Sequence, residues 1–120
     1  MHDLPVIQKT YDLIKWYIPI INKLPKHHKF GLGDRITLFL YQLLEELIIA
    51  RYTRDKIQLL EKLNANLDVI KHQTRLLFDF NLIEENRYIY INTQIHEIGN
   101  EIGGWLKQQK QQQKPKVKPA

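Results

Sequence analysis

The side chains in this sequence best able to do chemistry are its histidines, carboxylates and lysines, because the chain contains neither cysteine nor serine. Their absence removes disulfides, thiolate metal sites and the commonest nucleophiles. Carboxylate-bridged metal pairs in helical bundles need Glu-x-x-His on two helices. Here Val69 stands three residues before His72, and Thr93 stands three before His96. We therefore expect no catalytic residue, no metal site and no cofactor.

A basic segment from Pro25 to Arg35 is the part of the chain best suited to an anionic partner. Asp34 has the residue type of a helix N-cap, and Gly31 and Gly33 would permit a tight turn before it. The free amides of a helix start, together with nearby lysines, favour phosphate. The sequence thus predicts a basic loop that leads into a helix at residue 34.

Two features inside this segment have alternative interpretations. The adjacent His27 and His28 could bind a metal, but histidines in a lysine-rich loop are more often simply solvated. Phe30 could stack on a nucleic-acid base. Alternatively, Phe30 and Leu32 tuck inward and seal the end of the fold, and we favour this second arrangement.

The length and charge of the chain limit the classes of protein to which it can belong. The 120 residues fit one domain with a genuine core, and the net charge is +5. All 13 acidic groups lie before residue 107 and are balanced there by basic groups, so the excess comes from five lysines at residues 107–120. No signal peptide or membrane-spanning run is visible. We expect a soluble, cytoplasmic protein with no membrane partner.

Helical periodicity defines four segments, at about residues 4–24, 34–53, 55–80 and 88–107. The first has Ile7, Tyr11, Ile14, Ile18 and Ile21 at helical spacing, and Pro19 predicts a kink rather than a break. The third and fourth repeat apolar residues with 3-4-3-4-3 spacing. Residues 88–93 have strand-favouring types, but a lone strand would have no partner, so we predict helix.

The second helix is apolar on two sides. One stripe suits a bundle core: Ile36, Phe39, Leu40, Leu43, Leu47 and Ala50. A second stripe covers much of the remaining circumference: Leu38, Tyr41, Leu44, Ile48 and Tyr52. Either a neighbouring helix of the same chain covers the second stripe or it is a subunit interface. Gly99 and Gly103 leave a smooth strip on the fourth helix that a second backbone could approach, although Gly103 could instead mark a helix end.

Short links between the four helices predict an all-α, up-down-up-down four-helix bundle over residues 1–107. From residue 108 onward the sequence is a low-complexity run of Lys, Gln and Pro with one large apolar residue. Such a segment buries too little apolar surface to offset its ordering entropy, so we predict a disordered basic tail at residues 108–120.

The run from Leu24 to Ile36 (LPKHHKFGLGDRI) resembles the signature of a small four-helix-bundle family that includes the accessory variability determinant (Avd) proteins of diversity-generating retroelements. Three further blocks occur in matching order: Trp16 with Pro19, then residues 50–56 (ARYTRDK), then residues 98–107 (IGNEIGGWLK). The resemblance covers about residues 4–110.

This resemblance implies a non-catalytic accessory subunit that assembles as a homopentameric barrel. It would bind the element's reverse transcriptase and RNA or DNA without sequence specificity, and support mutagenic copying of a template repeat. Contact residues implied by the matching blocks are Lys26, Lys29, Arg35, Arg51, Arg54 and Lys56. Avd proteins tend to be basic throughout the fold, whereas residues 1–106 here carry no net charge.

Two alternatives remain. One is a related bundle protein encoded in an intervening sequence of a ribosomal RNA gene, whose role is unknown. The other is a bundle enzyme, such as a nucleotide or cobalamin transferase, which would need a bound cofactor.

Overall fold

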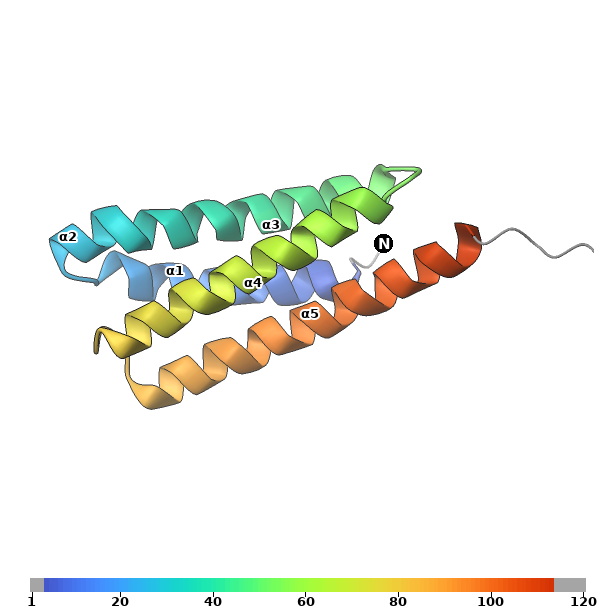
Figure 1. The fold of residues 1–120 in the computed structure, drawn as a ribbon. Helices are drawn as coiled ribbons and strands as arrows, with labels where there is room; N and C mark the ends of the chain where they lie inside the picture. Colours follow the sequence, from blue (N-terminus) through green and yellow to red (C-terminus); the bar gives the residue numbers. More distant parts are fainter. Residues whose placement is uncertain (1–3, 114–120) are drawn as a thin grey trace, which may run out of the picture.

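The computed structural model describes residues 4–113, and every secondary-structure element in that range is helical. Four long helices dominate: α1 (Pro5–Asn22), α3 (Asp34–Tyr52), α4 (Ile57–Asp79) and α5 (Glu85–Gln113). The short α2 (Lys26–His28) and the π-helical segment η1 (Lys29–Gly33) lead directly into α3. Successive long helices run in opposite directions (Figure 1), so the all-α four-helix prediction is confirmed.

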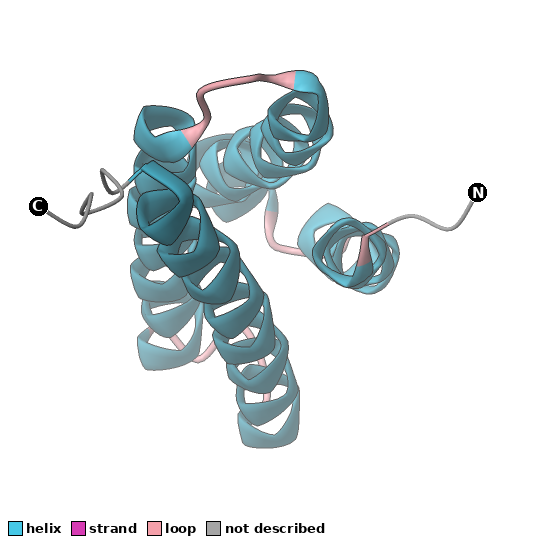
Figure 2. Cartoon of the chain, turned by 90° about the vertical axis from the view of Figure 1, so that its right-hand side faces the viewer, coloured by secondary structure: helices cyan, strands magenta, loops and turns pink. Residues whose placement is uncertain are grey.

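The four long helices are arranged so that each packs against two neighbours. α1 contacts α3 and α5, while α4 contacts α3 and α5 on the opposite side. Viewed from the end of the bundle, α1 is set somewhat apart from the others (Figure 2). The last turns of α5 extend beyond the start of α1 (Figure 1).

The core follows the predicted periodicity closely in three helices. The first stripe of α3 is buried except for a half-exposed Phe39, and all six seam residues of α4 from Leu60 to Leu77 are buried. In α5 the buried residues are Ile91, Ile95, Ile98 and Ile102, so the strand-like residues 88–93 are helical as predicted. These side chains form one apolar cluster.

α1 departs from its predicted stripe at Tyr11, and Ile18 of that stripe is only half-buried. Tyr11 is 49% exposed, while Thr10, Leu13 and Tyr17 are buried instead. The buried face therefore includes Leu13 and Tyr17 as well as Ile7, Ile14 and Ile21, and Tyr11 lies outside it. The helix continues through Pro19 without interruption.

The segment at residues 26–33 is helical, so the predicted basic loop is wrong. Pro25 precedes the new helix, and its carbonyl accepts from Lys29 N at 2.8 Å. The chain is helical without a break from Lys26 to Tyr52; Asp34 therefore lies inside the helix and makes no capping bond. No glycine in the described range has a positive φ.

Packing, rather than a turn, explains Gly33. A Cβ atom at this position would lie 3.0 Å from Cγ2 of Ile21 and 3.3 Å from the carbonyl oxygen of His28. Gly33 is buried where η1 packs against α1, next to Ile21. The missing side chain lets the π-helical segment approach α1 closely, whereas Gly31 faces open space.

The ends of α4 and α5 also differ from expectation. α4 stops at a Schellman motif: Asn81 adopts φ 59°, and Leu82 N donates to Leu77 O at 2.8 Å. α5 continues past residue 107 to Gln113, so the predicted tail begins six residues too early. Gln113 Nε2 donates to Asp55 Oδ1 at 3.0 Å, and Lys110 lies 3.4 Å from Glu61. The remainder of the predicted tail, residues 114–120, lies outside the described residues.

Candidate interaction surfaces

The outer face of α3 carries a row of uncovered apolar side chains. Leu38 is 55% exposed, Tyr41 44%, Ile48 41% and Tyr52 79%, while Leu44 is half-buried. These are the residues of the second stripe. Leu44 packs partly against the core, and no helix of the described chain covers the other four. Ile49, 56% exposed, widens the row. An apolar surface of this kind on a small domain is typical of an interaction site.

The pairing of α3 with α4 extends this surface. Lys62 Nζ lies 2.9 Å from Glu46 Oε1, and the rings of His28 and Phe80 have centroids 6.0 Å apart. In both pairs the two residue numbers add to 108. In this antiparallel register, a residue of α4 therefore lies opposite the residue of α3 whose number completes that sum. This register places Val69 opposite residue 39, beside Leu38. Val69 and Leu76 on α4, and Phe80 directly after it, are all at least 39% exposed, so the apolar surface spans both helices.

The two glycines of the predicted strip lie in different environments. A Cβ atom on Gly99 would lie 3.4 Å from Leu67 Cδ2, so Gly99 faces α4 of its own chain. A Cβ atom on Gly103 would meet nothing within 4 Å. Gly103 is not a helix end, because α5 continues for ten further residues.

The six predicted contact residues lie in two groups at opposite ends of α3. Lys26, Lys29 and Arg35 surround its start; Arg51, Arg54 and Lys56 surround its end. α3 has 19 residues, so the groups are separated by about 28 Å. One compact anionic ligand cannot contact both groups, whereas a polymer can.

The first basic group includes exposed aromatic rings. Phe30 is 59% exposed, which contradicts its predicted burial, and Lys29 Nζ lies 5.6 Å from the ring centroid. The helical geometry of η1 turns Phe30 outward while Leu32 packs partly against the core. His27 and His28 have ring centroids 4.0 Å apart, beside Phe80.

The second basic group is built on α5 as well as α3. Lys56 Nζ lies 5.1 Å from the ring centroid of Trp105, and the Arg51 guanidinium lies 5.8 Å from the Tyr52 ring. Arg54 is exposed. Sequence reasoning placed Trp105 in a matching block but could not pair it with Lys56, because that pairing depends on how α5 returns along the bundle.

One cation near the first group was missed by sequence reasoning. Arg87, at the start of α5, lines a small pocket with Lys23, Trp16, Pro19 and Ile20. Arg87 is far from Lys23 in sequence, and only the antiparallel return of α4 brings the two together. No local sequence signal could have identified it.

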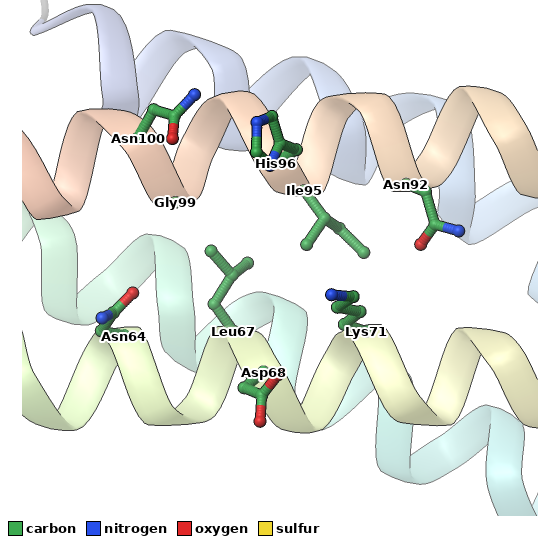
Figure 3. A pocket seen from close by; sticks show the side chains of 9 residues that line it. All are labelled: Asn64, Leu67, Asp68, Lys71, Asn92, Ile95, His96, Gly99 and Asn100. Atoms are coloured by element: carbon green, nitrogen blue, oxygen red, sulfur yellow. The ribbon is translucent and has the colours of Figure 1, made fainter.

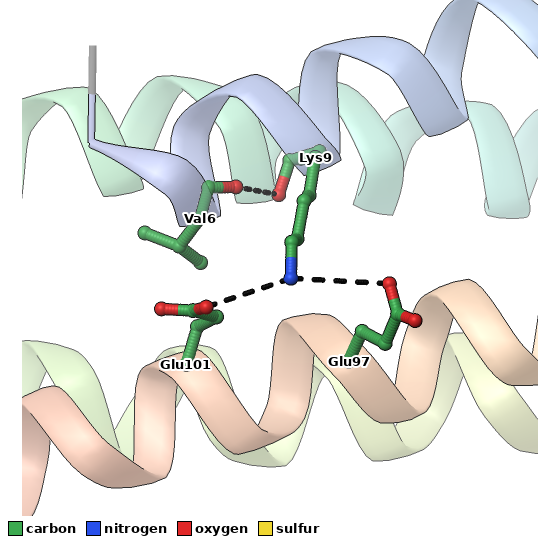
Figure 4. Close-up of polar contacts among 5 residues, drawn as sticks. Val6, Lys9, Glu97 and Glu101 are labelled. Atoms are coloured by element: carbon green, nitrogen blue, oxygen red, sulfur yellow. Dashed lines mark hydrogen bonds and ion pairs between the residues drawn. The ribbon is translucent and has the colours of Figure 1, made fainter.

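The contact between α1 and α5 is partly polar. Lys9 on α1 lies between two carboxylates of α5, 3.5 Å from Glu101 and 3.8 Å from Glu97 (Figure 4). All three side chains are about one-third to one-half exposed, so each ion pair contributes only about 0–1 kcal/mol. The cluster links α1 to α5.

The described residues contain no cluster of three His, Asp or Glu side chains arranged as metal ligands. In the same range, no helix is long and apolar enough to cross a bilayer. Fold and surfaces together define a four-helix bundle with one uncovered apolar face and a basic group at each end.

The chain belongs to the bAvd-like family, whose family model matches residues 4–109. No curated protein matches the sequence. The family match agrees with the resemblance based on residues 24–36 and 98–107.

Proposed function

We propose that this protein is a non-catalytic accessory subunit of a diversity-generating retroelement. It binds the element's reverse transcriptase and nucleic acid, and supports mutagenic copying of a template repeat. The observation that carries the proposal is membership of the bAvd-like family over residues 4–109. The protein acts in the cytoplasm, where the element is copied.

Self-association, as a homopentamer, occurs through the outer face of α3 and its extension on α4. Support comes from the exposure of Leu38, Tyr41, Ile48 and Tyr52, which a single chain leaves uncovered. Their burial would contribute roughly 25 cal/mol per Å² of apolar area. Gly103, with open space above it, is available to a neighbouring chain.

Nucleic acid binds at the basic groups on the two ends of each protomer. Lys26 and Arg35 are exposed at one end and Arg54 at the other. In a ring of protomers each group would repeat around one rim, which produces two rings of positive charge. Such contacts neutralise phosphates and read no base sequence.

The proposal is tested by co-expressing the full chain with a tagged reverse transcriptase encoded beside it. We expect the two proteins to co-purify after nuclease treatment, and the complex to extend cDNA on the template-repeat RNA. Each protein alone serves as the control. A chain that leaves the reverse transcriptase during purification and does not change its products would overturn the proposed function.

A further inference from the structure

A small pocket of about 210 Å³ lies between the C-terminal end of α1 and the start of α5. It is lined by Trp16, Pro19, Ile20, Lys23 and Arg87. None of these residues belongs to the outer face of α3, to its extension on α4 or to the two basic groups. The pocket is therefore a separate feature of the surface.

Two cations and no carboxylate line this pocket. Lys23 and Arg87 are both exposed, and neither forms an ion pair within the part of the chain that the structure describes. Glu84 and Glu85 precede Arg87 in the sequence, but neither lines the pocket. The site thus carries an excess of positive charge that the neighbouring side chains do not neutralise.

The other end of the contact between α1 and α5 has complementary charges. There Lys9 on α1 lies 3.8 Å from Glu97 and 3.5 Å from Glu101 on α5. At the pocket both helix ends present a cation instead, and like charges that face one another repel. An anion between Lys23 and Arg87 would remove this repulsion.

A second pocket, between α4 and α5, provides a comparison (Figure 3). Asp68 and Lys71 line it together, so with His96 neutral it has no excess charge. Its apolar floor is closed as well, since Leu67 and Ile95 are each only 4% exposed. Unbalanced positive charge therefore distinguishes the pocket between α1 and α5.

The two cations match a phosphate monoester better than other common anions. A phosphate monoester carries about −1.5 to −2 charge at pH 7, whereas a carboxylate or an internal phosphate of a nucleic acid carries a single charge. The planar guanidinium of Arg87 can donate two parallel hydrogen bonds to phosphate oxygens, and the Lys23 ammonium adds a compact charge.

Trp16 supplies an aromatic wall beside these cations. Its ring packs partly against the core and lies with its centroid 4.4 Å from that of Tyr90, so its position is fixed on two sides. The remaining surface of the ring lines the pocket with Pro19 and Ile20. Nucleic-acid bases stack on aromatic side chains of this kind. The pocket is smaller than the about 300–1,000 Å³ of most ligand sites, which suits one partly enclosed nucleotide.

We propose that the pocket between α1 and α5 binds a nucleotide that ends in a phosphate monoester. Lys23 and Arg87 hold the phosphate, and the base stacks on Trp16. A free nucleoside monophosphate and the phosphorylated 5′ end of an RNA strand present this same chemistry. The site goes beyond the proposed function, because it uses neither the surface for self-association nor the two basic groups.

Tryptophan fluorescence tests the site directly. The chain has two tryptophans, so in the full-length Trp105→Phe protein only Trp16 emits. Adenosine 5′-monophosphate should quench this emission saturably at constant ionic strength, and adenosine, which lacks the phosphate, should bind at least tenfold more weakly. In the same background, Lys23→Glu and Arg87→Glu should each weaken binding of the monophosphate at least tenfold. Lys15→Glu is the matched control, because it makes the same charge change at an exposed position of α1 outside the pocket, and it should leave the Kd within twofold.

Two twelve-nucleotide RNA strands, one with a 5′-phosphate and one with a 5′-hydroxyl, distinguish the two sources of phosphate. A preference for the phosphorylated strand that Arg87→Glu abolishes would support the proposal and assign the site to strand ends. Binding of the monophosphate without that preference would support it and assign the site to free nucleotides.

Equal quenching by adenosine and its monophosphate would overturn the proposal, as would the absence of quenching by both the monophosphate and the phosphorylated strand. An equal loss of binding in Lys15→Glu and Arg87→Glu would overturn it too, since the effect would then depend on net charge alone. Lys23 and Arg87 are exposed, so the helical circular-dichroism spectrum should not change in their variants. These measurements use the protein alone, so their failure is distinct from a failure to bind the reverse transcriptase.

Discussion

The hydroxyl of Tyr17 on α1 lies 2.9 Å from Oγ1 of Thr74 on α4, across the diagonal of the bundle. Both residues are fully buried. Thr74 in turn donates to the carbonyl of Ile70 at 2.8 Å, so the Tyr17 hydroxyl is the donor to Thr74. This pair fixes the rotation of α1 relative to α4, since the buried Tyr17 hydroxyl would lose its acceptor if either helix turned.

Removing one member of the pair should cost more than removing the other. Tyr17→Phe loses one hydrogen bond, and we expect about 0.5–1.5 kcal/mol less stability in urea unfolding. Thr74→Val leaves the Tyr17 hydroxyl buried without an acceptor, and we expect about 1–3 kcal/mol. The double variant should lose less stability than the sum of the losses in the two single variants. A loss equal to that sum would show that the hydroxyls are not coupled.

Alkaline pH should destabilise the protein through the same tyrosine. Burial raises the pKa of the Tyr17 phenol above its ordinary value. The unfolded chain therefore loses this proton first, near pH 10, while the folded protein retains it. Stability due to Tyr17 is complete below pH 10 and falls at about 1.4 kcal/mol per pH unit above it. Tyr17→Phe should show a shallower decline between pH 10 and 11, and identical slopes would refute this assignment.

The two glycines of η1 provide a matched test of packing. Gly31→Ala adds a methyl group in open space within a helix, and we expect about 0.5–1 kcal/mol of added stability. Gly33→Ala forces a Cβ atom against Ile21 and the His28 carbonyl, and we expect a loss of about 1–3 kcal/mol. The midpoint temperature of thermal unfolding should rise in Gly31→Ala and fall in Gly33→Ala. A Gly33→Ala protein as stable as wild type would mean that η1 does not approach α1 as described.

The outer face of α3 should control the mass of the protein in solution. Ile48→Glu places a carboxylate at the centre of the uncovered row. Light scattering should then give the mass of one chain, with little change in helical content, since Ile48 is 41% exposed within the chain. Gln58→Glu, an exposed polar position on α4, is the control and should keep the wild-type mass. A monomeric wild-type protein would contradict self-association outright.

The basic groups should determine how RNA binding responds to salt. Lys26→Glu with Lys29→Glu should weaken binding and reduce the slope of log K against log salt by about 0.7–0.9 for each lost phosphate contact. Truncation after Gln113 removes Lys114, Lys116 and Lys118 while keeping the bond from Gln113 to Asp55. A salt slope unchanged by truncation would show that these three lysines make no phosphate contacts.

Periodicity alone was sufficient to predict the four helices and most of the core. The α4 seam from Leu60 to Leu77 and the α5 isoleucines are buried as their spacing predicts. Burial in a bundle is decided mainly by which face of a helix is apolar, and this face is encoded locally. Residues 25–33 were misread as a loop because two glycines and a proline usually mark turns.

The sequence by itself determined the helical fold, the absence of cysteine and serine chemistry, and the two apolar sides of α3, since each depends on residue type or local spacing. Only the tertiary structure decided that the second side stays uncovered, that Gly99 faces Leu67, and that Lys56 meets Trp105. These relationships join residues on different helices. They follow from the register and direction in which the helices pack, and no local pattern specifies either.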